Sequence, residues 1–96
     1  MDKTVLMPEA LLPFDMYKNG HYCIIGWFAK HLCDLDVADQ PDLEEEAFEA
    51  VKDVFELQML ISIWKPSSEA KTMEDRLAHF REVCKEYNIE IIYPVA

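Results

Sequence analysis

Two His-x-Cys pairs, His21 with Cys23 and His31 with Cys33, contain the side chains best suited to bind a transition metal. Imidazole and thiolate are the ligands that zinc prefers, and four of them around one ion make a structural site. In a helix, however, residues two apart point about 200° apart around the axis. Neither pair would then converge on one ion, so we expect core thiols and no bound metal or cofactor.

Four acidic residues are spaced like the ligands of a calcium-binding loop: Asp34, Asp36, Asp42 and Glu45. That loop needs an oxygen ligand at its fifth position and glycine at its sixth, where this chain has Ala38 and Asp39. A solvated acidic connector therefore explains the segment better. A divalent-ion sensor is the alternative, and an unchanged melting temperature in calcium would exclude it.

The residue types that perform catalysis are present, but not in catalytic patterns. The chain has three cysteines, an odd number with no C-x-x-C spacing, and nothing in the sequence pairs any of them with a base. Gly20 and Gly26 match neither a Walker nor a Rossmann loop, and no serine lies in a glycine-flanked elbow. We therefore expect that the protein is not an enzyme.

Negative charge is concentrated in one segment. The chain has a net charge of −10, and the segment from Asp34 to Glu56 carries −9 of it, with Lys52 as its single basic residue. Such a surface disfavours direct binding of nucleic acid and favours a partner with a basic surface. The residues expected to bind that partner are Asp42, Glu44, Glu45, Glu46, Glu49, Asp53 and Glu56.

This acidic face has two interpretations. Carboxylates at helical spacings i, i+3 and i+4 lie about 5–6 Å apart, so they can imitate the phosphates of a nucleic-acid strand. The alternative is a solvated helix surface that only keeps the protein soluble. Because like charges this dense destabilise a helix, a basic partner would explain why they are there.

Composition indicates a folded domain. The chain has 96 residues, of which 51% are hydrophobic and 11% aromatic, and we expect one domain over residues 1–96. The N-terminus has no secretory pattern, and no apolar run approaches the roughly 18 residues of a membrane span. The unpaired thiols fit a reducing compartment, so we expect a soluble, cytoplasmic protein without membrane contact.

Apolar residues over 21–35 predict a central buried helix, with Gly26 allowing close approach of a neighbouring element. A strand over 21–25 is the alternative. The preceding Asn19-Gly20 indicates a turn, either in a two-residue hairpin or at the end of a short helix.

A second helix is expected after Asp42, which would cap it with Glu45 as the capping-box partner. The apolar spacing of residues 43–55 fits one helix face. Residues 57–64 continue as helix or as strand, because the period does not decide between them, and Pro66 is expected to end that element.

A third helix is expected over residues 73–87, capped by Thr72, with an apolar stripe and an end at Asn88. Residues 89–93 alternate like a strand, and residues 4–7 are its simplest partner. The predicted fold is α+β and mainly helical, with about three helices and a small two-stranded edge sheet from the termini.

The segment Asn19-Gly20-His21-Tyr22-Cys23-Ile24-Ile25-Gly26 resembles the N-G-x-x-C-x-x-G signature of small uncharacterised phage and prophage proteins. The resemblance implies a turn, a buried Cys/Gly helix, an acidic connector and a C-terminal helix. The chain departs from those proteins at Trp64-Lys65-Pro66, where an Asn-Asp pair is common. In size and charge it is also similar to phage inhibitors of host defence of the anti-CRISPR and anti-restriction type.

Two functions follow as hypotheses. The first is a phage-type inhibitor acting in the host cytoplasm, a DNA mimic whose acidic face docks on the nucleic-acid-binding surface of a defence effector or transcription factor. The second is a small adaptor or assembly module, itself an oligomer, that binds through exposed apolar surface. Its aromatic residues are more than so small a core is expected to enclose, chiefly Trp27, Phe28, Trp64 and Tyr93.

Overall fold

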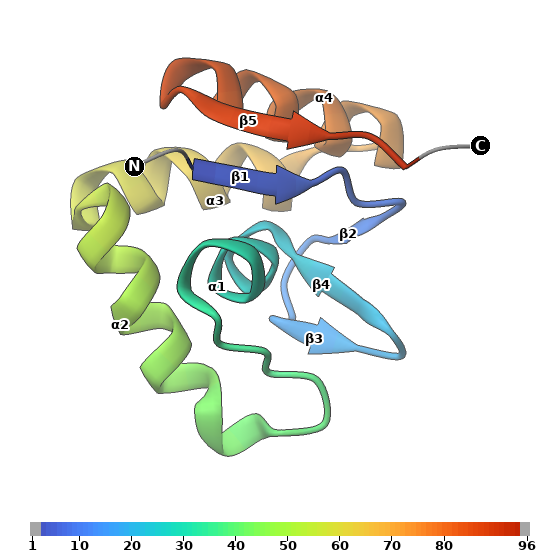
Figure 1. Cartoon of the computed structure of the whole chain (residues 1–96). Coiled ribbons are helices and arrows are strands. Elements are labelled where there is room, and N and C mark those ends of the chain that lie inside the picture. The colour runs from blue at the N-terminus through green and yellow to red at the C-terminus, as the bar shows by residue number, and fades with distance from the viewer. Residues whose placement is uncertain (1–2, 95–96) are drawn as a thin grey trace.

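A computed structural model of the chain describes residues 3–94 as an α+β fold dominated by helices. In Figure 1, α1 (Ile24–Cys33) lies at the centre, with α2 (Glu44–Phe55) along one side and α4 (Met73–Glu86) at the top. The fourth helix, α3 (Leu57–Glu69), runs behind β1, between α1 and α4 in this view. The expected domain, residues 1–96, has its extreme ends outside the described residues.

The chain termini form the expected two-stranded sheet. Strand β1 (Lys3–Leu6) pairs in parallel with β5 (Ile89–Ile92), so that Val5 is opposite Ile91. Figure 1 shows this pair beside α4, and Trp27 of α1 joins it by donating its indole N–H to the Leu6 carbonyl oxygen at 2.7 Å. The prediction of a terminal strand paired with the N-terminal residues is therefore confirmed.

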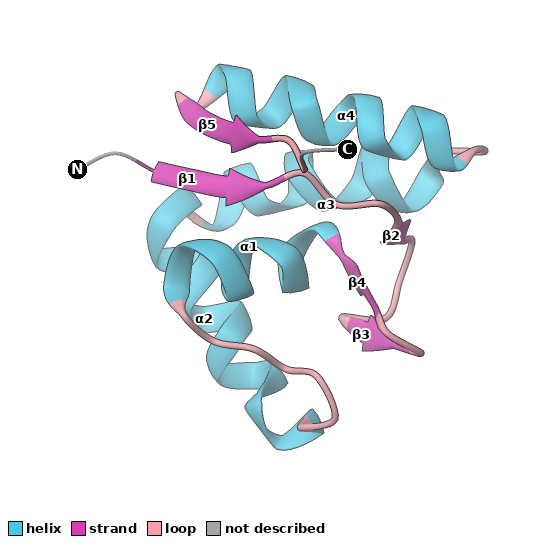
Figure 2. Ribbon diagram, turned by 45° about the vertical axis from the view of Figure 1, so that its right-hand side comes forward, coloured by secondary structure: helices cyan, strands magenta, loops and turns pink. Residues whose placement is uncertain are grey.

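A second small sheet was not predicted. It consists of β2 (Leu11–Leu12), β3 (Tyr17–Lys18) and β4 (His21–Cys23), with β4 in the middle (Figure 2). Asn19 and Gly20 connect β3 to β4 as a two-residue hairpin loop, both with positive φ, which is the preferred geometry for such a turn. The turn prediction is confirmed in its hairpin form.

The central helix is shorter than predicted because its first residues belong to β4. Cys23 ends the strand and caps α1, its Sγ accepting the Gly26 amide at 3.4 Å. The predicted helix over 21–35 and the alternative strand over 21–25 were therefore each right for part of the segment. Gly26 has the predicted role, since a Cβ there would collide with the Met16 carbonyl oxygen.

The prediction about the start of α2 was wrong, and the choice left open for residues 57–64 is resolved as helix. Asp42 does not cap α2: it lies in the 3-10 turn η1 (Pro41–Leu43), which leads directly into the helix without a side-chain cap. Residues 57–64 are helical, but they do not continue α2. Glu56, with φ 69° and ψ 150°, ends α2 and separates it from α3.

Pro66 does not end α3, which continues to Glu69 and so makes four helices in place of about three. A proline inside a helix costs about 3 kcal/mol because it removes one hydrogen bond and clashes with the preceding turn. Pro66 itself is exposed, while Ile63 and Ser67 on the inner side are buried. Tertiary packing of that inner side holds the last turn of α3 in place.

The third predicted helix is confirmed, beginning at Thr72, whose hydroxyl accepts the Asp75 amide at 3.0 Å. The burial of Arg76, which is 9% exposed, was not predicted from the sequence. Its guanidinium donates to the carbonyl oxygens of Leu11, Ser67 and Ala70 at 2.8, 3.1 and 3.2 Å. This one side chain therefore joins α4 to the end of α3 and to β2.

The core is built around Phe28. Its ring stacks on Phe80 of α4 at a centroid distance of 5.3 Å and meets Phe55 of α2 at 5.1 Å. All three rings are at most 2% exposed, so α1, α2 and α4 share one apolar centre. Phe28 is thus not among the surplus aromatic residues at the surface, whereas Trp64 and Tyr93 are 36% and 58% exposed.

Candidate functional site

The acidic face lies on the outer side of α2. Its apolar residues Ala47, Val51 and Phe55 are buried, which turns the opposite side of the helix to solvent. Glu45, Glu49 and Asp53 follow each other at every fourth position and are all exposed, so they form one row of carboxylates. We use the name acidic face for the seven residues Asp42, Glu44, Glu45, Glu46, Glu49, Asp53 and Glu56.

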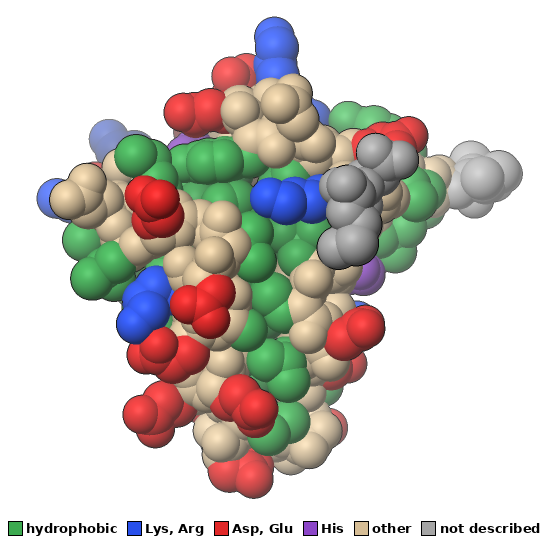
Figure 3. Space-filling view, turned by 60° about the vertical axis from the view of Figure 1, so that its left-hand side comes forward, with side chains coloured by type: hydrophobic (Ala, Val, Ile, Leu, Met, Phe, Trp, Pro, Cys, Tyr) green, Lys and Arg blue, Asp and Glu red, His purple; other side chains and the backbone are tan. Residues whose placement is uncertain are grey.

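The structure brings most of this face together. Glu46 is exposed beside the row, and Asp42 and Glu56 are exposed at its two ends, in η1 and at the α2–α3 break. Glu44 is only half-exposed, because it lies three positions before Ala47 and therefore near the buried side of α2. Figure 3 shows acidic side chains gathered over the lower part of the molecule, around α2.

Little positive charge offsets the acidic face. Lys52 Nζ lies 2.7 Å from Glu49 Oε2, three positions apart on the helix. Within residues 3–94, no other member of the face has an ion-pair partner. The Glu49 carboxylate raises the pKa of Lys52, which therefore remains charged. The face still presents excess negative charge to a partner.

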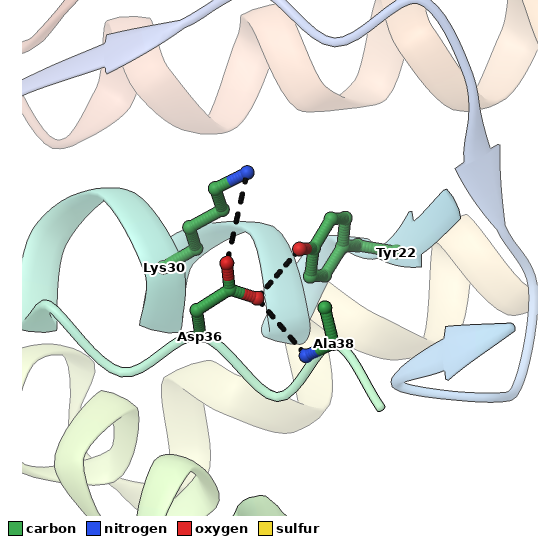
Figure 4. A network of polar contacts seen from close by, with 4 residues as sticks. All are labelled: Tyr22, Lys30, Asp36 and Ala38. Carbon is green, nitrogen blue, oxygen red and sulfur yellow. Dashed lines mark hydrogen bonds and ion pairs between the residues drawn. The ribbon is translucent and has the colours of Figure 1, made fainter. Parts of the chain in front are cut away.

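The connector before α2 is held by Asp36 (Figure 4). Its Oδ1 accepts the Tyr22 hydroxyl at 2.6 Å and the Ala38 amide at 2.9 Å, and Lys30 Nζ lies 3.9 Å from Oδ2. Together with the buried Val37, these contacts fix the path of the chain from α1 to η1. They thereby set where the acidic face begins.

Two pKa shifts follow from this network. Burial, reinforced by the hydrogen bond to Asp36, raises the pKa of Tyr22, so the hydroxyl stays protonated and donates. For Asp36, burial acts to raise the pKa, but the Tyr22 hydroxyl, the Ala38 amide and Lys30 outweigh it and lower the pKa. Asp36 is thus an ionised structural carboxylate, and not a free ligand of the calcium-type loop.

An apolar groove, which was not predicted from the sequence, lies beside the acidic face. It encloses a cavity of about 180 Å³ between the β2–β3 loop, the start of α1, α2 and α3. Phe14, Leu57 and Ile61 on its walls are 67%, 54% and 59% exposed. Its lining residues are Phe14, Met16, Cys23, Ile25, Phe48, Leu57, Leu60, Ile61 and Trp64.

The sequence contained one signal for this groove. Residues 57–64 have more apolar side chains than one buried helix face can use, and Leu60 and Ile63 alone fill the inner positions. Phe14, isolated between Pro13 and Asp15, gave no comparable signal. Its ring approaches that of Trp64, with centroids 6.3 Å apart, only because the chain folds back over α3.

The three thiols are poorly suited to nucleophilic chemistry. Cys23 and Cys84 are buried and Cys33 is half-buried, all three as free thiols. Burial raises the pKa of each, to about 12 for Cys84, and the nearby Asp34 and Asp53 raise that of Cys33 further. A thiol with a raised pKa is a weak nucleophile because little thiolate forms at neutral pH.

Only one of the two His-x-Cys pairs, His31 with Cys33, has the helical geometry assumed for both, because these two residues lie in α1. His21 and Cys23 lie in β4, where His21 is exposed and the Cys23 thiol is used as the cap of α1. The His31 ring packs against that of Trp27 at a tilt of 50°, with a centroid distance of 4.4 Å. Among residues 3–94, no three His, Cys, Asp or Glu side chains gather as metal ligands would.

Comparisons with known proteins give no relative for this chain: no protein-family model, curated protein or solved structure matches it. In the part of the chain that the structure describes, none of the helices has the length and apolar character needed to cross a membrane. The arrangement at the surface is therefore the basis for a functional proposal. Its two features are an acidic face on α2 and an apolar groove next to it.

Proposed function

We propose that this protein is a non-enzymatic, phage-type inhibitor whose acidic face docks on the basic, nucleic-acid-binding surface of a host defence or transcription protein. The observation that carries the proposal is the exposed row of Glu45, Glu49 and Asp53, with only Lys52 to offset it. Carboxylates repeated along a helix can occupy the positions of phosphates on such a surface. The acidic face is then the binding site, acting in the host cytoplasm.

The unfavourable electrostatic interactions within the acidic face support this interpretation. In α2, Glu44, Glu45 and Glu46 lie in the first turn, where negative charge interacts favourably with the helix dipole. Asp53 lies in the last turn, where the same charge is unfavourable, and it also faces Glu49 one turn away. Glu86 has the same unfavourable place at the end of α4, so the row of carboxylates one turn apart, and not the end position of Asp53, is what supports the proposal.

The proposal is tested by affinity capture from a bacterial lysate at about 50 mM and at about 500 mM salt, because screening is much stronger at the higher concentration. The bait is the wild-type protein or a variant with Glu45, Glu49 and Asp53 changed to Lys. We expect a nucleic-acid-binding protein to be captured by the wild type at low salt, released at high salt, and lost with the variant.

The control bait has the same number of charge reversals on α4 and beyond, at the exposed Glu74, Glu82 and Glu90. Its net charge equals that of the first variant, so it distinguishes the acidic face from overall charge. Equal capture by the α2 variant and the wild type would contradict the proposal. Equal loss with both variants would mean that net charge, and not this face, governs association.

A second candidate function is a small adaptor that binds through apolar surface. The exposed Phe14, Leu57 and Ile61 of the apolar groove favour it. In this case partners would be retained at high salt, and Ile61→Ser would release them while the α2 charge reversal would not. Sedimentation of the purified protein would show whether the partner is another copy of the chain.

A further inference from the structure

The apolar groove has a regular edge, provided by α3. Leu57, Ile61 and Trp64 are spaced at i, i+4 and i+7, so they lie on one side of the helix over two turns. With a rise of 1.5 Å per residue this stripe is about 10 Å long. The exposed fractions of its three side chains are 54%, 59% and 36%. A second helix laid against such a stripe would present its own apolar residues at the same spacing.

The opposite wall of the apolar groove is continuous with the acidic face. Phe48 of α2 lines the groove and is 37% exposed. Its helical neighbours at three and four positions are the buried Val51 and three charged residues, Glu44, Glu45 and Lys52, of which Lys52 is paired with Glu49. The wall is therefore apolar at its base and predominantly acidic at its rim.

The other walls carry less charge of either sign. Asp15, exposed and next to Phe14, adds a negative charge at the β2–β3 loop, and Lys65 adds a positive one after Trp64. The rim of the groove is therefore asymmetric, most strongly negative along α2. A ligand matched to it has one apolar side and positive charges toward α2.

We infer that the apolar groove takes the apolar face of an amphipathic, positively charged helix of the partner, with the basic residues of that helix meeting the acidic face. This inference rests on the proposed function and adds the partner's shape to its charge. A second copy of this chain fits poorly, because its net charge of −10 would bring carboxylates toward carboxylates. The geometry thus assigns a helix-in-groove mode of recognition.

A pair of designed peptides tests the inference. The first, of about 18 residues so that a helix can form, has leucines spaced i, i+3, i+4 and i+7 and lysines elsewhere. The second has the same composition with the leucines distributed around the helix. Binding of fluorescently labelled peptide to the full chain is measured at about 50 mM salt. We expect the amphipathic peptide to bind at least tenfold more tightly.

Matched variants locate the bound peptide. Ile61→Ser and Leu57→Ser alter exposed residues of the groove, and Ile92→Ser alters an equally apolar residue, 51% exposed, on β5. We expect each groove variant to weaken binding of the amphipathic peptide about tenfold and the β5 variant to leave it unchanged. In NMR spectra the indole signal of Trp64 should shift on binding, while that of Trp27, tied to β1, should not.

The outcomes separate this inference from the proposed function. If both peptides bind equally and the groove variants do not weaken them, the inference is overturned although the acidic face still binds basic ligands. If neither peptide binds while the wild-type protein still captures a partner that high salt releases, the inference is overturned and the proposed function stands. Two other outcomes would also overturn the inference. Self-association that Ile61→Ser abolishes would assign the groove to another copy of the chain. Binding to zwitterionic phosphatidylcholine vesicles that Ile61→Ser abolishes would assign it to lipid.

Discussion

Helices α2 and α4 are of similar length and each buries one side, yet they use charge differently. In α4 the first turn is acidic with Glu74 and Asp75, as the helix dipole favours, and the last turn contains Lys85 next to Glu86. In α2 the last turn likewise contains one base and one acid, Lys52 and Asp53, but the whole helix has five acidic residues and one basic residue, against four and three in α4. The comparison indicates that charge is nearly balanced in α4, whereas the outer side of α2 carries excess negative charge, which is unfavourable for the helix.

The two helices also differ in how they are fixed. Arg76 of α4 is buried and bonded to three backbone carbonyl groups, whereas α2 is held by its apolar side and by the connector that Asp36 fixes. Substitutions at these positions should therefore change the free energy of unfolding by different amounts and with different dependence on pH. Four predictions follow from this difference.

The largest effect is expected for Arg76→Met, which keeps the side-chain length but leaves three carbonyl oxygens without their donor. We expect the free energy of unfolding to fall by about 3 kcal/mol, as when one partner of a buried polar group is removed. Urea unfolding measures this, with the exposed Arg81→Met on the same helix as the control. Equal midpoints for the two variants would show that Arg76 does not anchor α4.

A smaller, pH-dependent effect is expected for Asp36→Asn. Because the pKa of Asp36 is lowered in the folded state, its contribution is present above the unfolded pKa of about 3.9 and is lost as pH falls through the folded value. We expect a loss of about 1 kcal/mol at pH 7, limited by solvent screening of this exposed carboxylate. The difference from wild type should vanish near pH 2. A difference that persists unchanged there would contradict the electrostatic account.

Charge reversals in the two helices should have opposite signs. Asp53→Lys removes an unfavourable charge from the last turn of α2 and places a positive charge four positions after Glu49, so we expect a gain of about 0.5 kcal/mol. Glu74→Lys removes a favourable charge from the first turn of α4 and should cost a similar amount. Thermal unfolding without a partner compares them. If both substitutions lower the melting temperature, the charge at Asp53 is not unfavourable in α2, and the proposed difference between the two helices is wrong.

The smallest effect is expected on the reactivity of Cys33. Burial is the main cause of its raised pKa, and Asp34 and Asp53 add to it, so Asp53→Lys should increase its alkylation rate a few-fold at pH 8. Cys84 of α4, with its pKa raised by burial to about 12, should react only when the protein unfolds. Mass spectrometry of iodoacetamide-treated protein resolves both sites. Glu74→Lys, which leaves Asp53 in place, should not change the Cys33 rate.

Local patterns in the sequence were sufficient for several elements. The turn at Asn19-Gly20, the cap at Thr72 and the pairing of residues 89–92 with the N-terminal strand were predicted and are confirmed. The turn and the cap depend on neighbouring residues, whereas the pairing of the strands was predicted because a lone C-terminal strand needs a partner and the N-terminal residues were the simplest one. The outer position of Glu45, Glu49 and Asp53 also follows directly from the apolar spacing of α2.

Predictions that depended on competing signals failed or stayed open. The Asp42 cap was wrong because Pro41 begins a 3-10 turn instead, and the stop at Pro66 was wrong because packing of Ile63 and Ser67 outweighs the local cost of proline. Residues 57–64 could not be assigned because buried and exposed apolar residues mix there and obscure the period. The break at Glu56, a non-glycine residue with positive φ, has no local signature.

The sequence by itself determined the fold class, the terminal strand pair and the concentration of negative charge on one helix, because these depend on residue type and spacing along the chain. Only the tertiary structure decided that Arg76 is buried, that Gly26 touches the Met16 carbonyl group, and that Phe14 meets Trp64 across the apolar groove. Those contacts join segments up to 65 residues apart. No local pattern encodes them, since they exist only once the core has brought the helices together.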